Sequence, residues 1–97
     1  MSIDLSEKLI QNIQKIGAKY PIEKIILFGS RARGTSRRNS DIDLAIFTLT
    51  EFENQGRFSS DIDDLETLLK IDIVFINEKT DLELMENIKK DGAVIYE

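Results

Sequence analysis

The sequence predicts an α+β fold of two layers, in which a small mixed β-sheet carries helices mainly on one face. Short apolar runs closed by glycine or polar residues indicate strands, and apolar residues recurring every three or four positions indicate amphipathic helices. The two kinds of segment alternate in the order helix, strand, short helix, strand, helix, strand, helix, strand. Such a chain buries its apolar surface by packing helices against a sheet.

The first half of the chain contains a helix, a strand, a short helix and a second strand. The first helix has an apolar stripe and ends at Gly17 or before Pro21; the stripe is Leu5, Leu9, Ile13, Ile16 and Tyr20. Residues 24–28 are an apolar run closed by Gly29, which predicts a buried strand. Residues 30–33 predict a short helix that begins at or near Ser30 and stops at Gly34.

The strand predicted over 41–47 places Ile42, Leu44 and Ile46 on one face and Asp41, Asp43 and Ala45 on the other. Residues 48–56 are polar and predict a loop. The next helix is predicted to end near Lys70, with Ser60 and Asp63 as a capping box; its stripe is Phe58, Ile62, Leu65, Leu68 and Leu69.

The end of the chain predicts a strand over 71–76, a short helix and a last strand over 93–96. Thr80 and Glu83 have the spacing of a capping box, which predicts where this helix begins. Leu84, Met85 and Ile88 form its apolar stripe, and Gly92 is expected just beyond its end, at C′.

Length and composition limit the function classes. The 97 residues predict one domain, 1–97, with 41% hydrophobic residues, as in globular proteins. No run is long enough to span a membrane, the start lacks the features of a signal peptide, and there are no cysteines, which fits a cytoplasmic protein. A net charge of −5 argues against direct nucleic-acid binding.

The chain has no histidine, so any metal site must use oxygen ligands, which suits Mg²⁺, Mn²⁺ or Ca²⁺. One basic turn interrupts the acidic surface. It contains Arg31, Arg33, Arg37 and Arg38, and the sequence leaves the roles of Arg31, Arg37 and Arg38 open.

Three aspartates are candidate ligands. Asp41 and Asp43 are two apart on a strand, so their carboxylates project from one face, roughly 6–7 Å apart along the strand. Asp72 interrupts an apolar run, where a carboxylate is costly unless it is paired or binds a cation. If the two strands are neighbours, the three form a site for a hard cation. Alternatively, Asp41 caps a turn and Asp72 reaches solvent at the start of its strand.

Gly29 and Ser30 are candidates for binding phosphate. A glycine allows close backbone approach, helix-opening N–H groups attract anions, and arginines such as Arg31 and Arg33 bind phosphate oxygens in a fork. A Gly-Ser pair alone is more often a simple turn, and the P-loop pattern is absent. A second Asp-x-Asp, in residues 61–64, is interpreted instead as the acidic first turn of a helix.

Together these motifs resemble a known family. Gly29-Ser30, ten intervening residues, Asp41-x-Asp43 and then Asp72 on a separate strand resemble the signature of polymerase-beta-like nucleotidyltransferases. The short chain, with GSRARG and SDIDLAI, is similar to the minimal nucleotidyltransferase (MNT) branch. Members of that branch act as antitoxins of HEPN-domain ribonuclease toxins.

The resemblance implies a polymerase-beta-like fold and a role for each matched residue. Gly29, Ser30 and Arg33 would bind the triphosphate of ATP or another nucleoside triphosphate, and Asp41, Asp43 and Asp72 would be catalytic and bind two Mg²⁺ ions, with Mn²⁺ possible. Asp72 would also help to deprotonate the acceptor. The chain has no acceptor-binding domain, so the implied acceptor is a hydroxyl side chain of a HEPN toxin in a hetero-oligomer, which receives AMP and is neutralised, as in a type VII-like antitoxin.

Three alternatives stay open from the sequence. The chain could neutralise the toxin by binding alone, without catalysis. Transfer to a small molecule such as an aminoglycoside ranks lower, because no acceptor domain is present. Template-directed polymerisation ranks lowest, because the chain is acidic and lacks a nucleic-acid-binding region.

Overall fold

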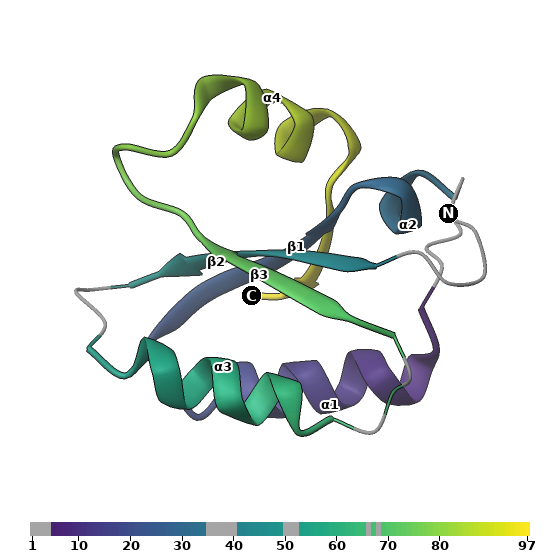
Figure 1. Ribbon diagram of the computed structural model, residues 1–97, viewed down its shortest axis with the longest axis vertical. Coiled ribbons are helices and arrows are strands. Elements are labelled where there is room, and N and C mark those ends of the chain that lie inside the picture. The colour runs from purple at the N-terminus through teal and green to yellow at the C-terminus, as the bar shows by residue number, and fades with distance from the viewer. Residues whose placement is uncertain (1–4, 35–40, 50–52, 66, 68) are drawn as a thin grey trace.

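The fold is built on a four-stranded sheet. A computed structural model describes residues 5–34, 41–49, 53–65, 67 and 69–97. Eight elements follow one another in the predicted order: α1 (Glu7–Gly17), β1 (Ile22–Phe28), α2 (Ser30–Arg33), β2 (Ile42–Thr48), α3 (Gln55–Asp63), β3 (Ile71–Phe75), α4 (Leu82–Asp91) and β4 (Ala93–Tyr96). The strand order is β3-β2-β1-β4 (Figure 1). Strand β1 is antiparallel to β2 and β4, whereas β2 and β3 are parallel, so the predicted mixed sheet is confirmed.

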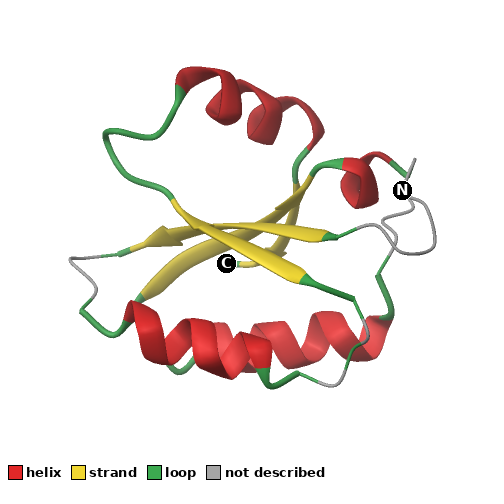
Figure 2. Ribbon diagram, viewed as in Figure 1, coloured by secondary structure: helices red, strands yellow, loops and turns green. Residues whose placement is uncertain are grey.

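Helices α1 and α3 cover one face of the sheet, and the core lies between them and the strands (Figure 2). Alternation along the strands sends the apolar residues to this face. Ile71, Ile73 and Phe75 of β3 pack against a buried cluster that both helices and the other three strands form. The cluster consists of Leu9, Ile13, Ile16, Ile22, Ile25, Leu27, Ile42, Leu44, Ile46, Phe58, Ile62 and Ile95.

The opposite face is partly covered, because α4 and the short α2 lie on that side. Ile88 of α4 is buried. A Cβ added to Gly92 would lie 2.6 Å from the Ile26 side chain and 2.2 Å from the Ile88 carbonyl oxygen. Gly92 thus follows α4 as predicted, but its backbone is extended (φ −68°, ψ 142°). The glycine is required by this close packing and not by a left-handed turn.

The predicted end of the third helix was wrong. Helix α3 ends at Asp63, not near Lys70, and begins after Asn54, so Ser60 lies inside it and forms no capping box with Asp63. Residues 61–64 are therefore at the helix's C-terminal end, not in its first turn. Asp61 is used structurally, since it accepts a 2.5 Å hydrogen bond from the Tyr20 hydroxyl, which raises the pKa of Tyr20.

The capping box predicted for α4 was also wrong, because the helix is capped one residue later than Thr80. Asp81 is the N-cap and accepts a hydrogen bond from the Glu83 backbone N–H, whereas the Thr80 hydroxyl accepts one from the Asn77 N–H in the preceding turn. No helix in the described ranges has the length and apolar character needed to cross a membrane.

Phe58 joins the two layers. Its fully buried ring makes edge contacts with Tyr20 (centroids 5.4 Å apart) and with Phe75 of β3 (5.9 Å). Phe58→Ala is expected to lower the free energy of unfolding by ~3–5 kcal/mol, because it leaves a cavity and removes both ring contacts. Urea unfolding measures this. The control is Leu82→Ala, since Leu82 is 80% exposed and its loss is expected to cost under ~0.5 kcal/mol; equal costs would contradict this description of the core.

Candidate functional site

The turn at Gly29 is the first part of the site. Strand β1 ends at Phe28, and Gly29 turns the chain into α2 with φ 79° and ψ −159°, a conformation that is essentially restricted to glycine. The Gly29 carbonyl accepts hydrogen bonds from the N–H groups of Ala32 and Arg33. Gly34 then ends α2 in the left-handed conformation, as predicted. Ser30 is the first helical residue, and the N-cap position before it is Gly29, which has no side chain to cap the helix.

Asp43 lies against this turn. Phe28 and Asp43 are partners in the antiparallel register of β1 and β2, so their side chains share a face. A Cβ added to Gly29 would lie 2.6 Å from Asp43 Oδ2. Gly29 is therefore needed twice, for its backbone conformation and for the space that the carboxylate occupies.

Asp72 is the register partner of Asp43 on β3. The two strands are thus neighbours, which is the condition that the sequence left open, and both aspartates are on the face opposite the helical layer of α1 and α3. Asp41 lies one residue before β2 and is exposed. Two positions before Asp43, it continues the same side of the strand.

Asp41 and Asp72 lie close enough to Asp43 to affect its ionisation. Burial raises the pKa of the Asp43 carboxyl above its ordinary value of 3.8, and the negative charges of Asp72 and Asp41 raise it further. Because like charges oppose the ionised form, a cation placed among them would relieve the repulsion.

The three aspartates do not form a complete set of ligands in this conformation. In the part of the chain that the structure describes, no three acidic residues are grouped tightly enough to chelate one metal ion. Asp72 is instead oriented toward Lys70, with Nζ and Oδ1 3.5 Å apart, and its side chain is 44% exposed. It can therefore turn toward Asp43 without disturbing the core.

The arginines of α2 differ. Arg33 is 47% exposed, and its Nη1 lies 3.7 Å from Oδ2 of Asp91, the last residue of α4. Arg31, whose role the sequence left open, is buried (5% exposed). No sequence signal could have shown this, since a four-residue helix has no periodicity to reveal its inner side. Arg37 and Arg38 lie outside the described residues.

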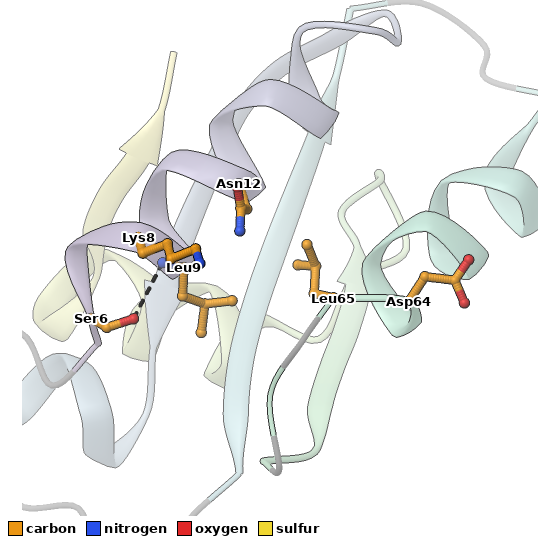
Figure 3. A pocket seen from close by; sticks show the side chains of 6 residues that line it. All are labelled: Ser6, Lys8, Leu9, Asn12, Asp64 and Leu65. Atoms are coloured by element: carbon orange, nitrogen blue, oxygen red, sulfur yellow. Dashed lines mark hydrogen bonds between the residues drawn. The ribbon is translucent and has the colours of Figure 1, made fainter.

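A hollow between the start of α1 and the end of α3 is lined by Ser6, Lys8, Leu9, Asn12, Asp64 and Leu65 (Figure 3). Its volume is about 230 Å³. It belongs to the helical layer, on the other side of the sheet from Asp43. Its serine hydroxyl already accepts a hydrogen bond from the Leu9 N–H as the N-cap of α1. The hollow is thus separate from the carboxylates.

Comparison with known proteins decides the family. The family model described as polymerase beta, nucleotidyltransferase matches residues 11–97. The chain belongs to the polymerase-beta nucleotidyltransferase family. A relative in Methanocaldococcus jannaschii, MJ0604, which carries the name of a protein adenylyltransferase, is 34% identical over 104 aligned positions, covering 93% of this nucleotidyltransferase and 97% of the relative.

Solved structures show the same fold. A toxin–antitoxin complex crystallised with AMP-PNP contains a chain that matches this nucleotidyltransferase with a TM-score of 0.66 and 24% identity, over 89% of this chain and 71% of that one. The complex of a tri-AMPylated HEPN toxin of Shewanella oneidensis with an MNT antitoxin gives a TM-score of 0.62 and 18% identity, over 94% and 71% of the two chains. The predicted polymerase-beta-like fold is confirmed.

The geometry at Gly29 yields a prediction. Gly29→Ala is expected to destabilise the fold by ~1–3 kcal/mol, because the backbone conformation is unfavourable for alanine and the added Cβ meets the Asp43 carboxylate. Urea unfolding again provides the measurement. Gly56→Ala is the matched control: nothing lies within 4 Å of its Cβ position in α3, so the change should stabilise by ~0.5–1 kcal/mol. Equal shifts of the same sign would contradict the close approach.

Proposed function

We propose that the chain transfers AMP from ATP to a hydroxyl side chain of a partner HEPN-domain toxin and thereby neutralises it. The observation that carries this proposal is the placement of Asp43 beside Asp72, directly against the Gly29 turn. It brings the two halves of the family signature together at one end of three neighbouring strands, β1, β2 and β3. The matched toxin–antitoxin complexes, one with AMP-PNP and one with an AMPylated HEPN toxin, support the choice of nucleotide and partner.

The residues fit the metal ions that such a transfer uses. Asp41, Asp43 and Asp72 offer only carboxylate oxygens, the ligands that Mg²⁺ and Mn²⁺ prefer. Burial and the neighbouring charges of Asp72 and Asp41 raise the pKa of Asp43, and a bound cation would offset both effects. When bound, two such ions would stabilise the charge on the attacking and leaving oxygens.

The chain's own residues perform the rest. Gly29 and Ser30 allow the triphosphate to approach the backbone at the start of α2, and Arg33 binds its non-bridging oxygens. The acceptor hydroxyl oxygen then attacks the α-phosphorus, the bond to the bridging oxygen breaks, and pyrophosphate leaves. Asp72, whose side chain is half-exposed, accepts the proton of the hydroxyl.

We propose that residues 1–97 are one minimal domain and that it works in the cytoplasm. The chain has no cysteine, and its stability therefore does not depend on disulfides, which are rare in that compartment. A net charge of −5 supports a protein rather than a nucleic acid as the acceptor.

Incubation of the chain with a HEPN-domain toxin, labelled ATP and Mg²⁺ tests the proposal. We expect label on the partner, and a decrease of ~100-fold or more in its rate when Asp41→Asn and Asp43→Asn are combined, the scale on which loss of electrostatic stabilisation acts. Asp63→Asn with Asp64→Asn is the control, because both residues are exposed on α3 or just after it, away from the site.

Two results would contradict transfer to the partner. The first is an unlabelled partner, and the second is equal labelling by the site variant and the control. If cells survive the toxin when Asp41, Asp43 and Asp72 are all changed to Asn at unchanged expression, neutralisation is by binding alone. Turnover of an aminoglycoside by the isolated chain would instead favour a small-molecule acceptor.

A further inference from the structure

The ion pair between α2 and α4 is a feature that the proposed transfer does not use. Arg33 is the last residue of α2, and Asp91 is the last residue of α4. Nη1 of Arg33 and Oδ2 of Asp91 are 3.7 Å apart. An acid at this position is unfavourable for α4 itself, because a helix C-terminus carries partial negative charge and favours cations such as the preceding Lys89 and Lys90.

Asp91 has a fixed position relative to the nucleotide site. Its side chain is 24% exposed, about half the exposure of Arg33. The neighbouring Gly92 packs against Ile26 of β1 so closely that a Cβ would lie 2.6 Å from the Ile26 side chain. Strand β1 then continues to Phe28 and the Gly29 turn. The backbone next to Asp91 is therefore packed against the strand that leads into the site.

Arg33 needs such an anchor. Its backbone N–H is hydrogen-bonded to the Gly29 carbonyl, which places the residue one turn from Gly29, but its side chain extends from a helix of only four residues and is 47% exposed. A long side chain in this position loses rotamer entropy when it binds a phosphate. A carboxylate that engages Nη1 reduces this loss and leaves the other guanidinium N–H groups available for phosphate oxygens.

We propose that Asp91 is a positioning residue, which holds the Arg33 guanidinium toward the triphosphate of the bound nucleotide. The inference rests on the proposed function, in which Arg33 binds that triphosphate. It assigns α4 a part in nucleotide binding, although α4 carries none of the residues of the family signature.

The sign of one mutational effect distinguishes positioning from simple electrostatics. Asp91→Asn removes a negative charge near the site of a polyanion, so electrostatics alone would strengthen nucleotide binding. Positioning predicts the opposite, a two- to fivefold weaker binding, since exposed ion pairs contribute up to ~1 kcal/mol and a factor of ten corresponds to ~1.4 kcal/mol.

The experiment is calorimetric titration of the intact chain with AMP-PNP in the presence of Mg²⁺. We compare wild type, Asp91→Asn, Arg33→Met and the double variant, with Glu86→Gln as the control because Glu86 is an exposed acid on α4. Arg33→Met is expected to weaken binding by tenfold or more, through loss of a charged hydrogen bond. Asp91→Asn should weaken it two- to fivefold in wild type and not at all in the Arg33→Met background, and Glu86→Gln should leave it unchanged.

Each other outcome overturns a stated part. Tighter or unchanged binding by Asp91→Asn, while Arg33→Met weakens binding, contradicts positioning and leaves the proposed function intact. Equal weakening by Asp91→Asn in both backgrounds means that Asp91 acts through the fold rather than through Arg33, which also overturns the inference. No effect of Arg33→Met contradicts the assignment of Arg33 to phosphate, and the inference fails with it.

Discussion

The parallel register of β2 and β3 places two carboxylates, those of Asp43 and Asp72, side by side, and the site depends on this unfavourable contact. The register is set by the core, because a slip of one residue would turn Ile42, Leu44 and Ile46 out of the buried layer. The apolar face of the sheet thus holds the charges of the opposite face together. Both the burial of Asp43 and its proximity to Asp72 and Asp41 raise the pKa of its carboxyl.

The same register explains why the chain turns as it does at the end of β1. Asp43 faces the end of β1 with its carboxylate in the space that a side chain at position 29 would need, so only glycine fits. Helix α2 begins at that point, and its last residue is paired with the end of α4. Asp43, Asp72, the Gly29 turn and Arg33 are therefore all placed by the pairing of β2 with its two neighbours, β1 and β3, and by the turn that follows β1.

Much of this could be predicted from the sequence, because the signals were local. Alternation within the strands, the apolar stripe of α1 and the glycines around α2 predicted the correct order of elements. The sequence left open whether the strands of Asp43 and Asp72 are neighbours, and the parallel register shows that they are. The errors came from motifs whose meaning depends on context. Ser60 has capping spacing but lies inside a helix that begins five residues earlier, and Thr80 caps a turn instead of α4. The buried state of Arg31 and the pairing of Arg33 with Asp91 required tertiary structure, since neither leaves a pattern in the chain.

The most direct test of a site built on repulsion is unfolding of wild type and Asp43→Asn across about pH 4 to 8, with and without Mg²⁺. Because the folded pKa of Asp43 lies above 3.8, folded wild type retains a proton that the unfolded chain releases, and its stability falls as pH rises from 3.8 to the folded pKa. Without metal, we predict that the advantage of Asp43→Asn grows with pH over that range. Saturating Mg²⁺ should stabilise wild type and remove that advantage. A difference that is independent of pH, or equal stabilisation of both proteins by Mg²⁺, would contradict a cation site held by these carboxylates.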